Sequence, residues 1–540
     1  RDTYPSAPII IFKSVKDSFF SVNSDEKLFE RNAFQFLFLH TLSRNKIRDL
    51  VIQYTRHREM GDDEMVLSKL IADLDGLNLH RTPLNCITLL KVLEVDFDDS
   101  PVNRTEVIRR VLFLLFNVDS VPIYKRRPDM KDCEHVLGWF CERLLRRSDI
   151  YFKYDFFIRK IKSFCKNNII DLDIELLFDV LFQNNIIVNT SRGFCFKFTY
   201  WVMYFAAQRM HHNQAFRDFI FEDMRYASYP ELIEFYTGID RRRDDALLLL
   251  IDDIKSIAFR VKEKLGFPED YELYSRAKWT PTDEIIENIK RELGNEVDSS
   301  NLPDIIKDEF ADRAYNPVKP YDQELRNVVE DYLLELLTNS MIAGARALRN
   351  SDYAEADIKK ELLKEILACW ELIAKIVMVL SPVLAKDGSA IFEGTRFVLV
   401  GNGLKDNPKE RFEGIFRCIP TNIVEWFAKD LYSHKMGPLF FDQIEGCISD
   451  LGKHYLALLL IANRLHNWKS KIEKYISTKN KNSFYLFDAQ NAIHIEQKYG
   501  FNGDAAQKEL LYLRKMAWAK HETGSKKPGI KLINKMEVKD

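Results

Sequence analysis

The apolar residues between positions 172 and 210 change from helical to strand-like spacing and back again, which limits the folds open to the chain. The first part of this stretch carries one apolar helical face, made of Leu172, Leu176, Leu177, Val180 and Leu181. Asn184 and Asn185 follow this face and predict the end of the helix. The elements that follow this helix decide which kind of domain the stretch forms.

Two runs rich in β-branched and aromatic residues follow the helix, at 186–188 and 194–198. The polar residues 189–193 separate the two runs and end in a glycine, which can adopt a positive φ at a turn. We therefore predict a β-hairpin, after which helical spacing resumes. Residues 154–166 upstream also have helical spacing. The order helix, helix, hairpin, helix is typical of a winged helix.

The second helix of this unit has the wrong charge for reading DNA. It carries Asp173, Glu175 and Asp179 but no lysine or arginine, so the phosphates of a duplex would repel it. We therefore interpret the winged helix as facing protein or nucleotide. Arg192 lies in the predicted wing and leaves DNA contact open as an alternative.

The composition predicts a folded chain of several domains. With 540 residues, the chain has room for roughly three to four domains. Apolar residues make up 46% and charged residues 30%, which excludes disorder for most of the chain. The net charge of −2 gives no global attraction to nucleic acid, which is not an expected partner. Eight scattered cysteines without CxxC pairs indicate free thiols in a reducing cytosol, so we expect a cytoplasmic protein.

Short amphipathic segments precede the winged helix and predict a small helical bundle at 27–130. One of its helices is predicted to begin at Pro83, with Thr82 as N-cap. The winged-helix domain is then assigned to 131–212. Residues 1–26 contain a strand-like apolar run, which we interpret as a residual strand and turn of a nucleotide-binding core.

Four segments taken in order resemble the C-terminal portion of a STAND-class P-loop NTPase of NACHT or NLR-like type: IRDLVIQY, LHRTPLNCITLLKVLE, NRTEVIRRVLFLLF and, at the end of the winged helix, FKFTYWVMYFAAQRM. The resemblance covers residues 27–212. It implies a helical lid over the adenine of ATP or ADP, bound with Mg²⁺ in the complete protein. Pro83 would contact the base, with Arg81 and Thr82 beside it. Residues 204–207 match the family's FFAA-like helix.

The chain departs from the family at one position. Many members carry a phosphate-contacting histidine shortly before that helix, and this chain has Phe198 there, flanked by Lys197 and Thr199. Either Lys197 replaces the histidine as the phosphate contact, or this winged helix does not touch nucleotide. The resemblance thus implies four nucleotide-binding candidates: Arg81, Thr82, Pro83 and Lys197.

No P-loop of the form GxxxxGK[ST] occurs in the chain. The lone GxG at 401–403 is better interpreted as a turn. The run LLLLIDD at 247–253 resembles a metal-binding strand end, but helical spacing continues beyond it, so we predict a helix. The chain alone is therefore not expected to hydrolyse ATP, and we predict no catalytic residue. ATPase activity would need the missing P-loop half.

Two short motifs carry possible metal ligands. Cys133 and His135 are two positions apart, and His211 is followed by His212. Neither motif has a second pair at the spacing of a zinc site, so we predict no metal site.

Helical patterns dominate the rest of the chain. They predict a helical connector at 213–314, a proline-bearing linker at 315–322 and a helical, repeat-like sensor domain at 323–540. Within the sensor domain, a small hairpin is predicted at 390–404, and residues 441–476 are interpreted as one helical run. The fold class is therefore mainly α, with a lid bundle, a winged helix and a C-terminal helical array.

The apolar run at 366–385 has the length of a membrane span. Glu371 and Lys375 interrupt it, and each would cost about 2.5–3.5 kcal/mol near the centre of a bilayer. In water the two side chains would form an ordinary pair on the surface of a helix. We predict a core helix and no membrane contact.

The resemblance implies the switch-and-sensor part of a STAND ATPase in prokaryotic antiviral defence. Such a protein recognises a foreign protein, here expected to come from a phage, and assembles into a tetramer or larger ring that activates an N-terminal effector. Two alternatives come from other classes: a winged-helix transcription regulator with a helical ligand-sensing domain, and a non-catalytic helical scaffold.

Overall fold

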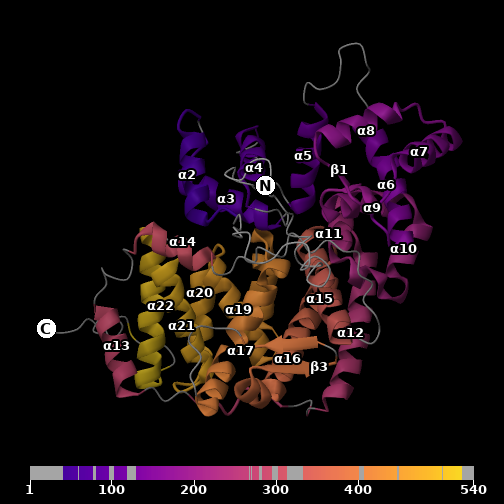
Figure 1. Cartoon of the computed structure of the whole chain (residues 1–540). Helices are drawn as coiled ribbons and strands as arrows, with labels where there is room; N and C mark the ends of the chain where they lie inside the picture. The colour runs from indigo at the N-terminus through magenta and orange to yellow at the C-terminus, as the bar shows by residue number, and fades with distance from the viewer. Residues whose placement is uncertain are drawn as a thin grey trace, which may run out of the picture.

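The computed structural model describes most of the chain beyond residue 40. The described residues are 41–58, 60–76, 81–95, 103–117, 129–266, 268, 271–278, 282–294, 302–312, 333–393, 395–399, 407–446, 449–500, 503–525 and 529. Within these ranges the protein is mainly α, as predicted, and its strands form two separate two-stranded antiparallel sheets (Figure 1). The predicted strand and turn at 1–26, residues 27–40 of the predicted helical bundle and the linker at 315–322 lie outside the described residues.

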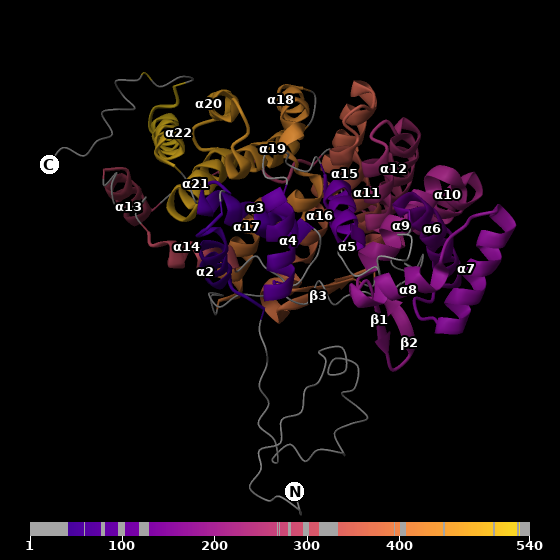
Figure 2. The ribbon, with the colours of Figure 1, turned by 90° about the horizontal axis from the view of Figure 1, so that it is seen from above.

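Four helices form the N-terminal part: α2 (Arg44–Thr55), α3 (Asp63–Gly76), α4 (Pro83–Val95) and α5 (Arg104–Asn117). Each contacts the next along the chain, so they pack as a small bundle (Figure 2). The predicted start of α4 is confirmed: Oγ1 of Thr82 accepts a hydrogen bond from the Asn85 amide at 3.3 Å, and Pro83 is the first helical residue.

Six elements follow in this order: α6 (Met130–Arg147), α7 (Tyr154–Asn168), α8 (Ile174–Gln183), β1 (Ile187–Thr190), β2 (Gly193–Phe196) and α9 (Thr199–His212). The helix end at Asn184 and the hairpin are confirmed. The turn is tighter than predicted because Asn189 and Thr190 pair within the hairpin. In addition, Phe152 exchanges two backbone hydrogen bonds with Phe194, at 2.9 and 2.8 Å, and adds a third short strand-like contact.

Helices α6 and α9 pack tightly through a glycine. A Cβ on Gly138 of α6 would lie 2.8 Å from the Phe205 carbonyl oxygen and 3.3 Å from Cβ of Arg209. Phe205 belongs to the buried stretch of α9 at 204–207. Only a residue without a side chain allows the two helices to come this close.

The central part consists of α10 (Gln214–Phe221), η1 (Glu222–Ser228), α11 (Pro230–Ile239) and α12 (Asp244–Leu265). Residues 247–253 lie inside α12, so the helical interpretation is confirmed. Helix α12 packs on α15 (Leu333–Asn350) and α16 (Ala356–Asp387), and all three contribute to one continuous apolar core. The predicted connector and the predicted sensor domain therefore share a core.

The C-terminal helices are α17 (Pro408–Leu431), α18 (Gly437–Glu445), α19 (Asp450–Asn463), α20 (Trp468–Thr478), α21 (Phe484–Tyr499) and α22 (Asp504–Thr523). The interpretation of 441–476 as one helical run is wrong. Helix α18 ends at Glu445, and α19 ends where Arg464 adopts a left-handed φ of 46°. Asn467, with φ 65°, precedes the start of α20. The predicted small hairpin is present as β3 (Ser389–Phe392) and β4 (Thr395–Val398).

Two further helices lie in the described part of the chain: α13 (Asp283–Gly294) and α14 (Asp304–Asp312). Figure 1 shows α14 between α2 and the C-terminal helices α21 and α22. Because α14 contacts both α2 and α21, it joins the N-terminal bundle to the C-terminal helices.

Helix α16 is the one helix among the described residues that is long and apolar enough to span a membrane, and more than half of its most apolar window is buried in the protein. It packs on α12, α15, α17 and α19. Glu371 of α16 accepts a hydrogen bond from the Ser449 hydroxyl at the start of α19. Helix α16 therefore has the burial and the contacts on several sides that are typical of a core helix.

The contact at Gly138 can be tested against a glycine in open space. We expect Gly138→Ala to lower the free energy of unfolding by about 1–2 kcal/mol, because the clash outweighs the gain in helix propensity. A Cβ on Gly414 of α17 would meet nothing within 4 Å. Gly414→Ala should therefore stabilise the protein by about 0.5–1 kcal/mol. Urea denaturation of both variants checks the pair, and equal effects would contradict the packing.

Candidate functional site

Five residues form a cluster of ion pairs between the N-terminal bundle and α14, which we call the α14 clasp: Arg44, Arg48, Arg81, Asp308 and Asp312. Oδ1 of Asp308 lies 2.9 Å from Nε of Arg44 and 2.8 Å from Nη2 of Arg48. Nη1 of Arg81 lies 2.7 Å from Oδ1 of Asp312. Oδ2 of Asp312 also accepts the backbone amide of Arg44 at 2.9 Å. Only the fold brings these distant parts of the chain together.

The clasp is largely removed from water. The Asp308 side chain is 1% exposed and that of Arg44 is 8% exposed. Glu64 of α3 adds a carboxylate 2.7 Å from Arg44 and also pairs with Arg48. The hydrogen bond to Asp308 raises the pKa of Arg48 well above its ordinary value, with a further contribution from Glu64. Burial makes each charge depend on its partners.

Helix α14 also contacts the C-terminal helices, so it connects them to the N-terminal bundle. The rings of Phe310 on α14 and Tyr499 on α21 are stacked, with 4.2 Å between their centroids. The α14 clasp and this stack lie on the same short helix. The N-terminal bundle is thus held to α21 by charge on one side of α14 and by an aromatic contact on the other.

The structure places three of the four predicted nucleotide-binding residues at the start of α4. Arg81 is buried in the α14 clasp, Thr82 caps the helix and Pro83 is exposed at its first position. The guanidinium of Arg81 is directed to Asp312.

Lys197, the fourth predicted residue, follows β2. Its backbone amide donates to the Ile186 carbonyl oxygen at 2.8 Å, and its Nζ lies 5.4 Å from the centroid of the Phe198 ring. Burial lowers the pKa of the half-buried lysine. Its ammonium forms no ion pair with another residue in the described part of the chain. Figures 1 and 2 both place α5 between α4, which begins at Pro83, and the hairpin that Lys197 follows.

The cysteine and histidine motifs do not converge on a metal site. The rings of His135 and His212 lie 6.2 Å apart, while Cys133 is buried. His211 is turned to α11, where its Nε2 donates to the Tyr236 carbonyl oxygen at 3.0 Å. Over the residues that the structure describes, no three histidine, cysteine or acidic side chains are grouped to hold an ion.

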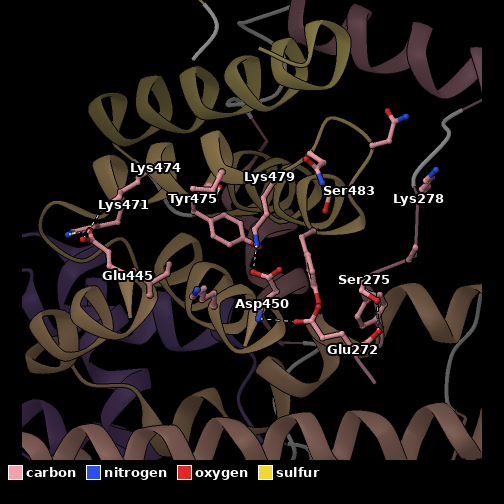
Figure 3. Close-up of a pocket in the computed structure, with 18 residues that line it drawn as sticks. Glu272, Ser275, Lys278, Glu445, Asp450, Lys471, Lys474, Tyr475, Lys479 and Ser483 are labelled. Carbon is pink, nitrogen blue, oxygen red and sulfur yellow. Dashed lines mark hydrogen bonds and ion pairs between the residues drawn. The ribbon is translucent and has the colours of Figure 1, made fainter. Parts of the chain in front are cut away.

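A second candidate site is a cavity of about 460 Å³ among the C-terminal helices, which we call the lysine pocket (Figure 3). Five lysines line it: Lys278, Lys453, Lys471, Lys474 and Lys479. They come from the segment 271–278, from α19 and α20, and from the residue after α20. Three carboxylates, those of Glu272, Glu445 and Asp450, also line the cavity, so the charges of its lining sum to plus two.

The carboxylates hold some of these lysines in place. Glu445 pairs with Lys471 at 2.6 Å and with Lys474 at 2.9 Å. These contacts, Lys471 first, lower the pKa of Glu445 to about 2. Asp450 lies 3.2 Å from Nζ of Lys479. The remaining lysines, Lys278 and Lys453, form no ion pair with any residue that the structure describes.

A buried polar chain supports the wall of the lysine pocket. Nδ1 of His454 lies 2.7 Å from the Tyr475 hydroxyl, and its Nε2 lies 2.8 Å from Oδ2 of Asp488. His454 belongs to α19, Tyr475 to α20 and Asp488 to α21, and all three are buried. Tyr475 in turn packs its ring 4.8 Å from Nζ of Lys479. These two contacts fix the three helices relative to one another, and the lysines remain at the surface of the cavity.

Sequence reasoning missed both Asp308 and Asp312 of the clasp and all the lysines of the pocket. The aspartates lie in an ordinary acidic helix, and nothing local marks them as partners of arginines more than 200 positions away. The lysines of α20 repeat as KxxK at 471–474, which is a common pattern on a solvated helical face.

Comparisons with models of protein families, with curated proteins and with solved structures find no match to this chain.

The importance of the α14 clasp can be measured by unfolding. We expect Asp308→Ala to lower the free energy of unfolding by about 3 kcal/mol, because it leaves the buried guanidinium of Arg44 with fewer partners. Asp49→Ala is the matched control on α2: it removes an exposed pair with Lys46 at 3.2 Å and should change stability by less than about 0.5 kcal/mol. Similar losses in both variants would show that the clasp contributes little.

His211 should make the protein sensitive to acid. Burial is the main cause that lowers its pKa from 6.5 to about 4, so the unfolded chain binds a proton more readily than the folded one. The contribution of His211 is therefore complete above pH 6.5 and is lost as the pH falls toward 4, by about 3 kcal/mol. His211→Gln should flatten the stability profile in this window, whereas His57→Gln, at an exposed position, should not.

Proposed function

We propose that this chain is the switch-and-sensor part of a STAND or NLR-like ATPase that recognises a foreign protein, expected to come from a phage, and oligomerises to activate an N-terminal effector. In this proposal α2–α5 are the lid, α6–α9 are the winged helix, and the helices after residue 323 are a repeat-like sensor. The observation that carries it is the α14 clasp, because it ties the proposed lid to helices far along the chain through contacts that can break.

A switch needs two arrangements of similar free energy. The clasp supplies a closed arrangement whose stability depends on a few buried charges. A ligand that moves such an equilibrium from 1:99 to 99:1 must bind the open form better by about 5.5 kcal/mol. The clasp can open at a cost that such a ligand could supply, because both partners of each ion pair regain water when they separate. The energetics of the clasp therefore suit a switch.

The ammonium of Lys197 supports a phosphate contact. A half-buried ammonium without an ion pair is unfavourable, and a phosphate would provide the missing countercharge. Arg81 has a different role in this closed arrangement because Asp312 already neutralises it. We propose that Pro83 and Thr82 border the base, that Lys197 meets phosphate when the P-loop half is present, and that the nucleotide is ATP or ADP with Mg²⁺.

The transcription-regulator alternative has less support. Helix α8 presents acids, and Glu175 pairs with Lys162 of α7 at 3.0 Å. The guanidinium of Arg192 lies 5.5 Å from the centroid of the Tyr151 ring, so it packs back on the protein. A DNA-facing surface would need basic side chains directed to solvent on α8 or the wing. A cytoplasmic sensor without nucleic acid or membrane partners fits these charges better.

Retained nucleotide tests the proposal. The protein is expressed with any residues that naturally precede Arg1 and is purified by gel filtration, and bound ADP or ATP is quantified by chromatography. Pro83→Ala should weaken retention about tenfold, which corresponds to about 1.4 kcal/mol of lost base contact. Pro408→Ala is the matched control, since Pro408 also opens a helix behind a capping side chain, that of Asn407, which accepts the Lys409 amide at 3.0 Å.

Nucleotide-free protein with its complete N-terminus would overturn the proposal. Equal loss in Pro83→Ala and Pro408→Ala would also contradict it, because the effect would then come from helix stability alone. Lys197→Gln separates the two interpretations of the winged helix: reduced retention indicates a phosphate contact, and unchanged retention indicates that this domain does not touch nucleotide.

A further inference from the structure

We infer that the lysine pocket binds a small molecule that carries several phosphate groups. This inference is independent of the proposed function, because the pocket is built from residues 272–485 and includes none of the four predicted nucleotide-binding residues. It rests on the size of the cavity, on the distribution of its charges and on the chemistry of its lining.

The cavity has the size of a small-molecule site. Its volume of about 460 Å³ lies within the range of roughly 300–1,000 Å³ that is usual for ligand pockets. Figure 3 shows Lys471 and Lys474 at one end, Lys278 at the other and Lys479 between them. A single phosphate cannot reach both ends. The spacing of the cations therefore selects a ligand with several anionic groups along its length.

The ammonium of Lys479 is held in a defined position at the wall of the cavity. It is 8% exposed, and its Nζ lies 4.8 Å from the ring centroid of Tyr475 and 5.0 Å from that of Tyr485. These two rings and Asp450 limit the positions that its ammonium can take. Lys278 and Lys453 have no ion pair within the described residues, so they can approach an anion without first giving up a carboxylate.

The lining carries cations that can bind phosphate oxygens. It contains five lysines, and a lysine ammonium binds phosphate as a point charge. Ser275, Ser483 and Asn482 provide hydroxyl and amide donors in the same cavity.

The wall of the pocket also contains an unsatisfied donor. The Tyr485 hydroxyl is buried and has no hydrogen-bond partner among the described residues. The Tyr485 side chain is 4% exposed and lines the cavity. A phosphate oxygen of the ligand would give this hydroxyl an acceptor. The carboxylates of Glu272, Glu445 and Asp450 oppose an anion, but each is close to a cation or to a backbone amide, as where Glu272 accepts the Asp450 amide at 3.2 Å.

The probes are inorganic pyrophosphate and ATP, titrated without Mg²⁺ into the full chain and followed by calorimetry. We expect ATP to bind more tightly than AMP, and the affinity to fall as salt is raised, because several lysines neutralise the phosphates. The double variant Lys278→Ala/Lys453→Ala removes the two lysines without ion pairs and should weaken binding of ATP about tenfold. It breaks no described contact of these side chains, so the fold should be unaffected.

The control Lys386→Ala/Lys409→Ala removes the same charge from exposed positions on α16 and α17, and it should leave binding unchanged. Pro83→Ala should also leave it unchanged, which separates the lysine pocket from any lid site. No binding of either probe at millimolar concentration overturns the inference. Equal weakening in both double variants does so too, since binding would then follow net charge alone. Binding of an oligoglutamate peptide in place of the phosphates would identify an acidic protein segment as the ligand and would likewise overturn it.

Discussion

The buried carboxylate of Glu234 is the constraint on which the centre of the molecule depends. Its residue on α11 is fully buried, and a charge in that position must be neutralised by close partners. Arg349 of α15 pairs with it, Arg346 lies 3.5 Å away, and Asn350 donates to the Glu234 backbone oxygen at 3.0 Å. Arg346 also pairs with Asp430 of α17 at 2.7 Å. The network fixes the positions of α11, α15 and α17 relative to one another, because a shift of any one helix would leave a buried charge without a partner.

The N-terminal bundle is attached to the rest of the molecule in a different way. One attachment is the α14 clasp. The other lies between α5 and α11, where Nδ2 of Asn103 donates to the Gly238 carbonyl oxygen at 3.2 Å, and where a side chain on Gly238 would overlap Thr105. The second contact depends on close backbone approach, whereas the clasp depends on charge. Under the proposed function, the α5–α11 contact is the natural pivot and the clasp is the part that opens, since ion pairs regain water when they separate.

Local signals in the sequence were sufficient to predict many helices and strands. They were insufficient to predict which distant residues these elements contact. Thr82 and Pro83 marked the start of α4 because a cap and a first-turn proline act within one helical turn. Arg464 and Asn467 interrupt the helical run at 441–476 because both adopt a left-handed backbone conformation. Neither residue is a glycine, so the sequence does not mark these two positions. Tertiary packing determines the backbone conformation there. Helix α17 lies within the predicted helical domain, but Pro420 in its interior hides its extent from local patterns, because proline is unfavourable inside a helix. The clasp and the lysine pocket join residues that are close only after folding, so neither has a sequence signature.

Helix α21 connects the two candidate sites. Tyr485, near its N-terminal end, lines the lysine pocket, and Tyr499, at its C-terminal end, stacks on Phe310 beside the clasp. The 14 positions between them span roughly 21 Å at the rise of an α-helix. A helix moves as a rigid body over this length, so a tilt that changes the pocket wall also displaces Tyr499 from α14. Coupling of this kind requires only that a pocket ligand bind one tilt of α21 better than the other. The architecture thus gives the clasp a physical link to the C-terminal helices that does not pass through the central ion network.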